Sequence, residues 1–237
     1  MIPSLATALF ALALGQASPD AATPAPEPVP PPAAPALPAA APEAEAPPPP
    51  VPSLVSAEPL RGTSLVEASA GWPRMRLAYA QGLSHTSDLG GFADFDYGTT
   101  ELRAGLGYRG TLVPPAPPFE GALRLSLAWY HDSGGQWIYK KNHSDEGLEI
   151  GVGISYSRRG AGGVLSLLAD VPITITFRKD GGVLVVPKAA FAYQAPLYGP
   201  FTIGLQLGLG LRVGIGNAPL KEGMAEITVL ALAGWRL

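Results

Sequence analysis

Between Phe201 and Ile215 the sequence reads F-T-I-G-L-Q-L-G-L-G-L-R-V-G-I, with an apolar residue at every odd position and Gly, Thr, Gln or Arg at every even one. Successive side chains of a β-strand point to opposite faces, so a two-residue period predicts a strand with one apolar and one polar face. The stretch is long enough for a tilted strand to cross a hydrocarbon layer. An outer-membrane barrel strand has this pattern, because its outward side chains touch lipid and its inward ones touch a polar lumen.

The same alternation runs from about Ser69 to the C-terminus. Eight segments carry it: 75–79, 102–108, 123–129, 148–156, 165–177, 183–193, 201–215 and 227–237. They predict an all-β fold, an eight-stranded antiparallel up-and-down transmembrane barrel. Pro73, Pro172 and Pro187 fall in or beside these segments, and proline removes a ladder donor, so bulges or strand ends are expected there.

Alternation alone fits a soluble barrel as well, with the two faces exchanged. Only 15% of the residues are charged, however, and the polar face is mostly Gly, Ser and Thr, whereas a soluble surface carries more charge. The apolar face is bulky throughout, too bulky for a small barrel interior. Aromatic residues also fall near predicted strand ends, as at the two lipid interfaces of a membrane barrel: Tyr108, Tyr156, Tyr193, Phe201 and Trp235 at one end, Trp129 and Phe177 at the other.

The polar faces carry charges of both signs, which we expect to pair in a lumen charge network. Its members are Arg76, Glu101, Arg103, Arg124, Glu149, Asp170, Lys188, Arg212 and Glu226. An eight-stranded barrel is just wide enough inside for its side chains, and unpaired charges there would be costly, so a plugged interior is predicted. The lumen glycines, Gly105 and Gly107 among them, relieve crowding in this interpretation. The alternative is a water-filled channel for small solutes.

Three regions follow from composition. Residues 1–17 have an apolar stretch and small residues before Ser18, as in a signal peptide cleaved after Ala17. Residues 18–60 are rich in Pro and Ala, which favours a disordered, solvated linker that would lie in the periplasm. Such a linker could contact the cell wall or act only as a spacer. Residues 61–237 form the predicted barrel.

Composition also excludes several classes. The chain has no cysteine, which excludes disulfides, thiolate metal sites and a lipidated N-terminal Cys. From Arg61 onward the chain has sixteen basic and fourteen acidic residues, so it lacks the excess of positive charge typical of nucleic-acid-binding proteins. The sequence contains no run of about twenty apolar residues, so it predicts no transmembrane helix. No cofactor is expected.

The C-terminal run Ile227-Thr-Val-Leu-Ala-Leu-Ala-Gly-Trp-Arg-Leu237 resembles the terminal assembly signal of Gram-negative outer-membrane proteins, although Leu237 replaces the usual final Phe or Trp. Residues from about 69 to 237 resemble the small eight-stranded family that includes the OmpA membrane domain and OmpX. The resemblance implies an outer-membrane location, contact with membrane lipid and lipopolysaccharide, and recognition of the C-terminal strand by the barrel-assembly machinery.

One group of residues has the composition of a catalytic site. His131 and Ser133 are two apart on one predicted outward face, where an imidazole could take the hydroxyl proton of a nucleophile, and Glu146 has the parity to orient the imidazole. The His-x-Ser motif resembles outer-membrane phospholipases and lipid A 3-O-deacylases. In the deacylases the motif lies near the C-terminal strands and an Asn follows the Ser, whereas here Gly134 follows. An outer-leaflet acyl hydrolase is therefore an alternative, and a non-enzymatic barrel the main prediction.

Two long loops are expected outside the cell, at 84–98 and 131–147. The first interleaves acids with aromatic residues and favours a solvated binding loop, with a Ca²⁺ site at Asp94 and Asp96 as the alternative. In the second, Lys140 and Lys141 lie near His143 and could contact anionic lipopolysaccharide or be a solvated tip. No metal site is assigned.

Overall fold

A computed structural model describes residues 51, 53–112, 119–135, 144–160, 162–177, 181–216 and 225–237. The predicted signal peptide and linker residues 18–50 and 52 lie outside these ranges, as do Lys140, Lys141 and His143. No helix within the described ranges has the length and apolar character needed to cross a membrane. The strands are β1 (Ser64–Trp72), β2 (Arg74–Gly82), β3 (Ser87–Asp96), β4 (Glu101–Thr111), β5 (Phe119–Ser133), β6 (Ser144–Gly160), β7 (Gly163–Thr176), β8 (Gly182–Val185), β9 (Lys188–Tyr198), β10 (Phe201–Leu211), β11 (Val213–Gly216) and β12 (Ala225–Arg236).

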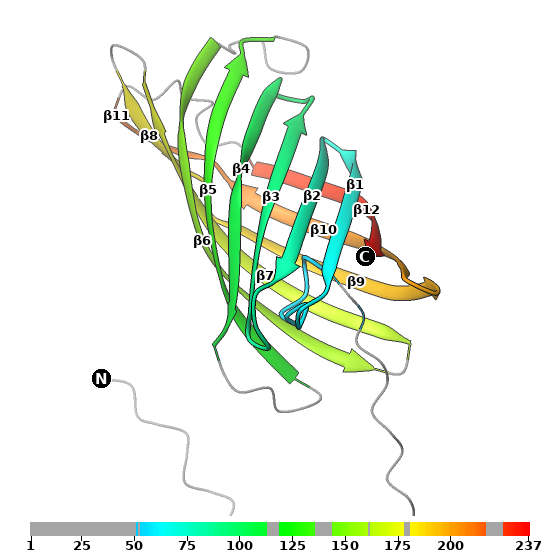
Figure 1. Cartoon of the computed structure of the whole chain (residues 1–237). Helices are drawn as coiled ribbons and strands as arrows, with labels where there is room; N and C mark the ends of the chain where they lie inside the picture. Colours follow the sequence, from blue (N-terminus) through cyan, green and yellow to red (C-terminus); the bar gives the residue numbers. More distant parts are fainter. Residues whose placement is uncertain are drawn as a thin grey trace, which may run out of the picture. The chain divides into compact units, whose positions relative to one another are not determined.

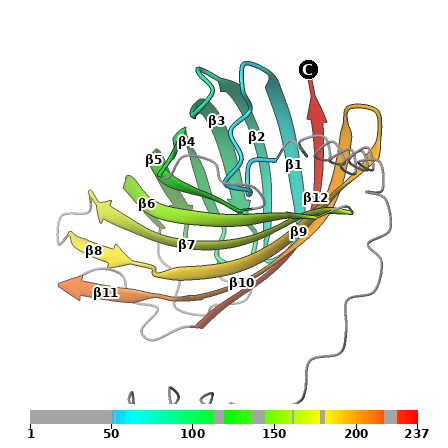
Figure 2. The same cartoon turned by 90° about the horizontal axis from the view of Figure 1, so that it is seen from below.

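The strands form a closed antiparallel barrel (Figure 1, Figure 2), which confirms the predicted all-β antiparallel barrel. The ring runs from β1 through β7 in chain order, then through β9, β10 and β12 back to β1. The barrel therefore has ten strands, and the predicted number of eight is wrong. The two short strands β8 and β11 pair with each other and extend the wall beyond the ring, next to β7.

The two ends of the barrel are easily told apart. Ser64 at the start of β1 lies beside Leu237, whose N–H donates to the Ser64 carbonyl oxygen at 2.9 Å. We call this the terminal end and the opposite one the far end. At the far end β5 and β6 extend beyond β1 and β2 in Figure 1, so the wall is uneven in height.

The two strands absent from the prediction have weak alternation. In β1 the outward positions include Ala68 and Ala70, while Leu65 points inward and is fully buried. In β3, Phe92 shares the inward face with Asp94, and a glycine occupies the outward position before it. The predicted loop over 84–98 is therefore wrong, because most of it is β3, and only a short turn at 83–86 precedes that strand at the terminal end.

The apolar face points outward and the polar face inward along the strands. Leu77, Leu127, Ile154 and Leu207 are each about half exposed, while their polar sequence neighbours face the lumen. Forty large apolar or aromatic side chains are exposed among the described residues, too many for an ordinary soluble surface.

The prolines lie where the ladder is interrupted, as their missing N–H requires. Pro73 separates β1 from β2, and Pro187 separates β8 from β9. Pro172 lies within β7 at the point where its partner changes from β9 to β8, and its carbonyl accepts a hydrogen bond from the Val186 N–H at 3.0 Å.

Residues 53–60, which the sequence analysis placed at the end of the linker, lie inside the barrel. All of them except Leu54 are buried, and Ser53 and Ser56 are completely inaccessible to solvent. A tight turn joins them to β1, with Arg61 and Gly62 at φ of 52° and 83°. We call residues 53–60 the plug segment, because they fill the terminal half of the lumen.

Candidate functional site

The lumen is the candidate functional site, and its terminal half is filled by the plug segment. Arg109 of β4 holds the backbone of that segment: its Nη1 donates to the carbonyl oxygens of Ser53 and Ser56, both at 2.7 Å. The Nε of the same guanidinium donates to Asp88 of β3 at 2.7 Å. Asp88 in turn accepts the Leu60 N–H at 2.8 Å. One ion pair between neighbouring strands therefore binds both ends of the plug segment.

Other side chains of the wall satisfy the remaining polar groups of this segment. Ser157 of β6 accepts the Ala57 N–H at 2.7 Å, and Glu67 of β1 accepts the Leu54 N–H at 3.1 Å. The amide of Gln194 on β9 lies between Glu67 and the Ser53 hydroxyl, and hydrogen-bonds to both. Since buried N–H and C=O groups must be paired, these contacts explain how an irregular segment is accommodated inside a barrel.

The plug segment also has an ionic and an apolar contact with the wall. Glu58 forms two contacts of 2.8 Å with the guanidinium of Arg159 on β6. Val55 packs in a buried cluster with Leu168 of β7 and with Leu230 and Leu232 of β12, at positions that would otherwise leave apolar side chains facing a polar lumen. Attachment thus involves strands on several sides of the barrel.

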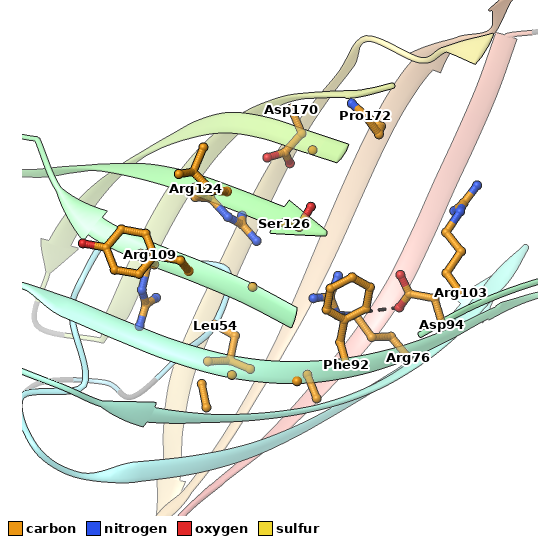
Figure 3. A pocket seen from close by; sticks show the side chains of 18 of the residues that line it. Leu54, Arg76, Phe92, Asp94, Arg103, Arg109, Arg124, Ser126, Asp170 and Pro172 are labelled. Atoms are coloured by element: carbon orange, nitrogen blue, oxygen red, sulfur yellow. Dashed lines mark ion pairs between the residues drawn. The ribbon is translucent and has the colours of Figure 1, made fainter. Parts of the chain in front are cut away.

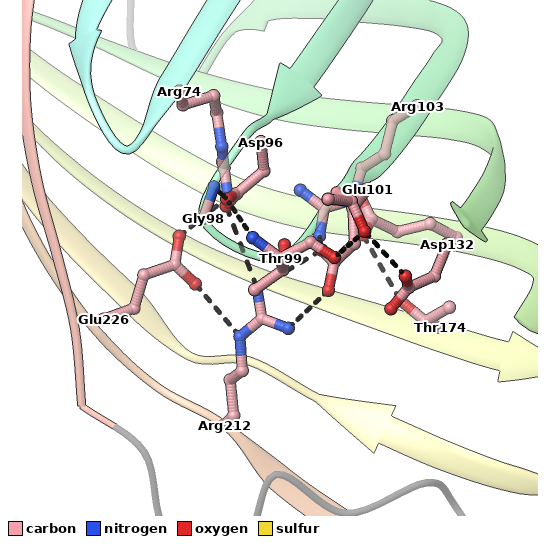
Figure 4. Close-up of polar contacts among 12 residues, drawn as sticks. Arg74, Asp96, Gly98, Thr99, Glu101, Arg103, Asp132, Thr174, Arg212 and Glu226 are labelled. Carbon is pink, nitrogen blue, oxygen red and sulfur yellow. Dashed lines mark hydrogen bonds and ion pairs between the residues drawn. The ribbon is translucent and has the colours of Figure 1, made fainter. Parts of the chain in front are cut away.

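A second barrier lies toward the far end, where eight charged side chains form a connected set; Figure 4 shows the part around Glu101 and Glu226. We call this set the far-end cluster, and its members are Arg74, Asp96, Glu101, Arg103, Glu149, Lys188, Arg212 and Glu226. Four are cations and four are anions, so the formal charges cancel. Glu101 is 1% exposed and is the centre of the cluster.

The geometry around Glu101 explains why this carboxylate tolerates burial. Arg212 binds it in a bidentate manner at 2.7 and 3.2 Å, and the Nη2 of Arg103 lies 2.7 Å from Oε2. The Nε of Arg103 also lies 3.1 Å from Oε2 of Glu149, and the Thr174 hydroxyl donates to the same Glu149 oxygen at 3.2 Å. Charge-assisted, bidentate contacts of this kind offset the desolvation of buried charges.

The other half of the cluster surrounds Glu226 of β12. Its Oε1 lies 2.7 Å from Arg74 and 3.1 Å from Lys188, and its Oε2 lies 3.5 Å from the Nε of Arg212. Arg74 also contacts Asp96 at 3.3 Å. Glu226 on β12 therefore pairs with β2 and β9, each two places away around the ring. Arg212, directly after β10, reaches Glu101 of β4 on the opposite side, so ion pairs cross the lumen.

Between the plug segment and the far-end cluster lies a chamber, and Figure 3 shows the larger of its two cavities. The chamber comprises two adjoining cavities of about 180 and 120 Å³, with Leu54 of the plug segment in the lining of both. Arg76, Asp94, Arg124 and Asp170 line both cavities as well. Arg76 lies over the ring of Phe92, with its guanidinium carbon 4.5 Å from the ring centroid. The Nε of Arg76 lies 3.6 Å from Oδ1 of Asp94.

Each predicted member of the lumen network faces the lumen, but the structure does not bring all of them together. Glu101, Arg103, Glu149, Lys188, Arg212 and Glu226 belong to the far-end cluster. Arg76 pairs instead with Asp94. Arg124 of β5 and Asp170 of β7 lie on either side of Gly153 of β6. The described residues give neither of them an ion pair within 4.0 Å.

Sequence reasoning assigned no such role to the wall residues that hold the plug segment, namely Asp88, Arg109, Arg159 and Gln194. Their role depends on residues 53–60, which follow a Pro/Ala-rich stretch. Leu54, Val55 and Leu60 were the available signal, because they interrupt that composition with larger apolar side chains.

The candidate catalytic residues are only partly assembled. His131 Nδ1 lies 3.2 Å from Glu146 Oε1, since the two residues are directly opposite on β5 and β6. The ring of Trp129 stacks on the imidazole with centroids 5.4 Å apart. The Ser133 hydroxyl lies 3.5 Å from the Thr100 carbonyl oxygen, and no hydrogen bond joins it to His131 in the described part of the chain. The contacts expected of a nucleophile and its base are thus not formed.

Asp94 and Asp96, considered above as Ca²⁺ ligands, both point into the lumen from β3 and pair with arginines. Asp96 also accepts the backbone N–H groups of Gly98 and Thr99 at 3.0 and 3.1 Å. No group of three or more metal-ligating side chains is found among the described residues.

Comparisons with protein-family models, with curated proteins and with solved structures find no match to this chain.

Proposed function

We propose that this chain is a non-enzymatic outer-membrane β-barrel protein whose closed barrel is a membrane anchor. The observation that carries the proposal is the continuous outward apolar surface around a closed ring of ten strands. A closed barrel leaves no unpaired edge in the hydrocarbon, and every lipid-facing position can then be apolar without exposing backbone polar groups.

Aromatic side chains near both ends support this proposal. At the terminal end Phe119 stacks on Tyr156 with ring centroids 5.6 Å apart, and Phe201 stacks on Trp235 at 5.5 Å. At the far end Trp72 packs edge-on against Tyr97 at 5.6 Å. Aromatic belts at two levels are typical of membrane barrels, since these rings favour the headgroup region.

The state of the lumen favours an anchor over a channel. Two independent barriers, the plug segment and the far-end cluster, lie in series along the axis. The plug segment is attached to the barrel through interior contacts as well as through its connection to β1. The barrel would hold the predicted Pro/Ala-rich linker at the periplasmic face, where it could reach the cell wall.

The C-terminal strand supports a route of assembly. β12 closes the ring by pairing with both β1 and β10, and its outward positions include Ile227, Val229 and Trp235. Recognition of this strand by the barrel-assembly machinery belongs to the proposal, as does contact with lipid and lipopolysaccharide. The likeness to the OmpA and OmpX family is now limited to general architecture, because the number of strands differs.

Cell fractionation tests the proposal. The protein should sediment with outer membranes in a density gradient, and in detergent it should migrate differently on a gel before and after heating, because a folded barrel stays compact. Purified protein in planar bilayers should give no steady conductance steps, since both barriers are in place. A protein recovered as a soluble periplasmic monomer would refute the anchor, and large stable steps would favour the channel instead.

A further inference from the structure

Arg124 is the one lumen cation in the described residues for which neither an ion pair nor a hydrogen bond is found. Its side chain extends from β5 into the chamber (Figure 3), and its Nη1 atom is inaccessible to solvent. A guanidinium is always charged and offers five N–H donors. A buried donor without a partner is uncommon in a folded protein and calls for a ligand or a water.

The nearest acid does not reach this guanidinium. Arg124 is opposite Gly153 of β6, and Gly153 is opposite Asp170 of β7. The Asp170 carboxylate lies over Gly153, so close that a Cβ at that glycine would collide with its Oδ1. Arg124 and Asp170 therefore flank the same gap above Gly153, but no ion pair with an N–O distance of 4.0 Å or less joins them among the described residues.

The surroundings of Arg124 offer further groups for an anion. Arg76 of β2 lies in the lining of the same two cavities, and its only ion pair among the described residues is the long one of 3.6 Å to Asp94. Ser126, two residues from Arg124 on the same face of β5, adds a hydroxyl to the lining. The larger cavity, about 180 Å³, exceeds the space that one water needs.

From this arrangement we propose that the chamber binds a small oxyanion, a phosphate or a carboxylate, on the guanidinium of Arg124. The planar N–H donors of arginine match the paired oxygens of both groups. Arg76 and Ser126 would contact the remaining oxygens. Asp170 is a competing negative charge beside the same site, so it limits the affinity. This inference concerns the interior alone and does not depend on where the barrel resides.

Equilibrium dialysis of the purified full chain in nonionic detergent tests the proposal with two labelled probes, inorganic phosphate and acetate. Ionic strength is held constant with chloride, and samples are equilibrated long enough for anions to enter by local opening around the plug segment. Three variants accompany the parent: Arg124→Gln, Asp170→Asn and, as a matched control, Arg158→Gln, whose arginine is exposed on the outside of β6.

The parent should bind at least one probe saturably, and the preferred probe then distinguishes a phosphate site from a carboxylate site. Arg124→Gln should lower the affinity by at least about tenfold, whereas Arg158→Gln should leave it unchanged. Asp170→Asn should raise it, because a competing charge is removed while Arg124 remains. A structural pair bridged by water predicts the opposite for this variant: no gain in anion binding and a loss of stability. Absence of saturable binding by the parent, or equal binding by the parent and Asp170→Asn, would overturn the proposal. The Asp170→Asn comparison remains decisive if Arg124→Gln fails to fold.

Discussion

Arg109 is expected to be the main latch of the plug segment, and Arg109→Ala should release that segment while the barrel stays folded. The wild-type guanidinium donates to two backbone carbonyls of the segment, those of Ser53 and Ser56, at 2.7 Å each. Alanine cannot replace either bond. The Leu60 N–H keeps its acceptor on Asp88, so the C-terminal end of the segment remains attached.

The size of the effect follows from these contacts. A hydrogen bond to a charged group contributes about 1.5 to 3 kcal/mol net, so the two bonds to the segment account for at least about 3 kcal/mol. Each 1.4 kcal/mol changes an equilibrium tenfold. The fraction of molecules with the plug segment released should therefore rise about 100-fold. Arg109→Lys keeps a positive charge, but one ammonium cannot contact Asp88 as Nε does and also reach both carbonyls as Nη1 does, so it should give an intermediate increase.

A single thiol reports this release, because the chain contains no cysteine. Val55→Cys places the thiol in the buried cluster with Leu168 and Leu230, where a cysteine is tolerated as a small apolar side chain. Maleimide labelling in detergent micelles then measures how often the segment opens, since labelling requires exposure. The labelling rate of Val55→Cys should rise about 100-fold when Arg109→Ala is added.

Two controls make the result interpretable. Arg158→Ala removes an exposed arginine whose contact is with the ring of Phe119, and it should leave labelling unchanged. Heat-modifiable gel mobility after labelling shows that the barrel is still folded. If Arg109→Ala labels at the parent rate in folded protein, the guanidinium does not hold the segment and the reasoning fails.

Three further pairs of variants test other parts of the structure. Leu207→Arg, on the outward face of β10, should cost about 2 to 4 kcal/mol in lipid, whereas Gln206→Arg, facing the lumen, should cost less; a denaturant titration of folded protein in vesicles in which these effects are reversed would mean that the faces are assigned backwards. Glu101→Gln removes the charge shared by Arg103 and Arg212 and should destabilise by about 3 to 5 kcal/mol, whereas Glu146→Gln, at an exposed ion pair, should cost about 1 kcal/mol or less; equal midpoints of heat-modifiable mobility would contradict this. Gly105→Ala would overlap the Leu127 carbonyl oxygen and should cost about 1 to 3 kcal/mol, while at Gly107 the nearest atom lies 3.9 Å from a new Cβ and alanine should be tolerated; the same titration measures both, and similar losses would show that the barrel adapts at Gly105.

The architecture was predictable where side-chain alternation is strong. In β10 each outward position is a bulky apolar residue, and the predicted face of Leu205 and Leu207 agrees with the structure. In β1 small alanines face outward and Leu65 faces inward, so hydropathy does not alternate there. In β3 the inward Phe92 has the same effect. A strand is specified by backbone pairing with its neighbours, and such strands become visible only once the neighbours are placed.

The candidate site was predictable in its composition but not in its pairing. Inward charges could be identified from parity, yet which of them meet depends on the stagger of strands around the ring. Arg212 reaches Glu101 across 111 positions of sequence, and Arg74 reaches Glu226 across 152. No local pattern encodes such contacts. His131 and Glu146 are an exception, because they lie on the two strands of one hairpin and parity alone indicated their proximity.

A ring of ten strands, rather than the predicted eight, gives a physical reason for the plug segment. The diameter of a barrel grows with the number of strands, and eight is about the number whose side chains just fill the interior. Two additional strands leave more space than these side chains occupy, since many inward positions are glycine, including Gly153 and Gly210. Empty space beside buried charges is costly, because each charge then lacks either a partner or water. The plug segment fills part of this space. Its N–H and C=O groups are partners for Asp88 and Arg109, and Val55 covers apolar side chains of the lumen. Leu54 of the segment lines the chamber, and Arg124 in the same lining is the lumen cation to which the described residues give no hydrogen bond or ion pair.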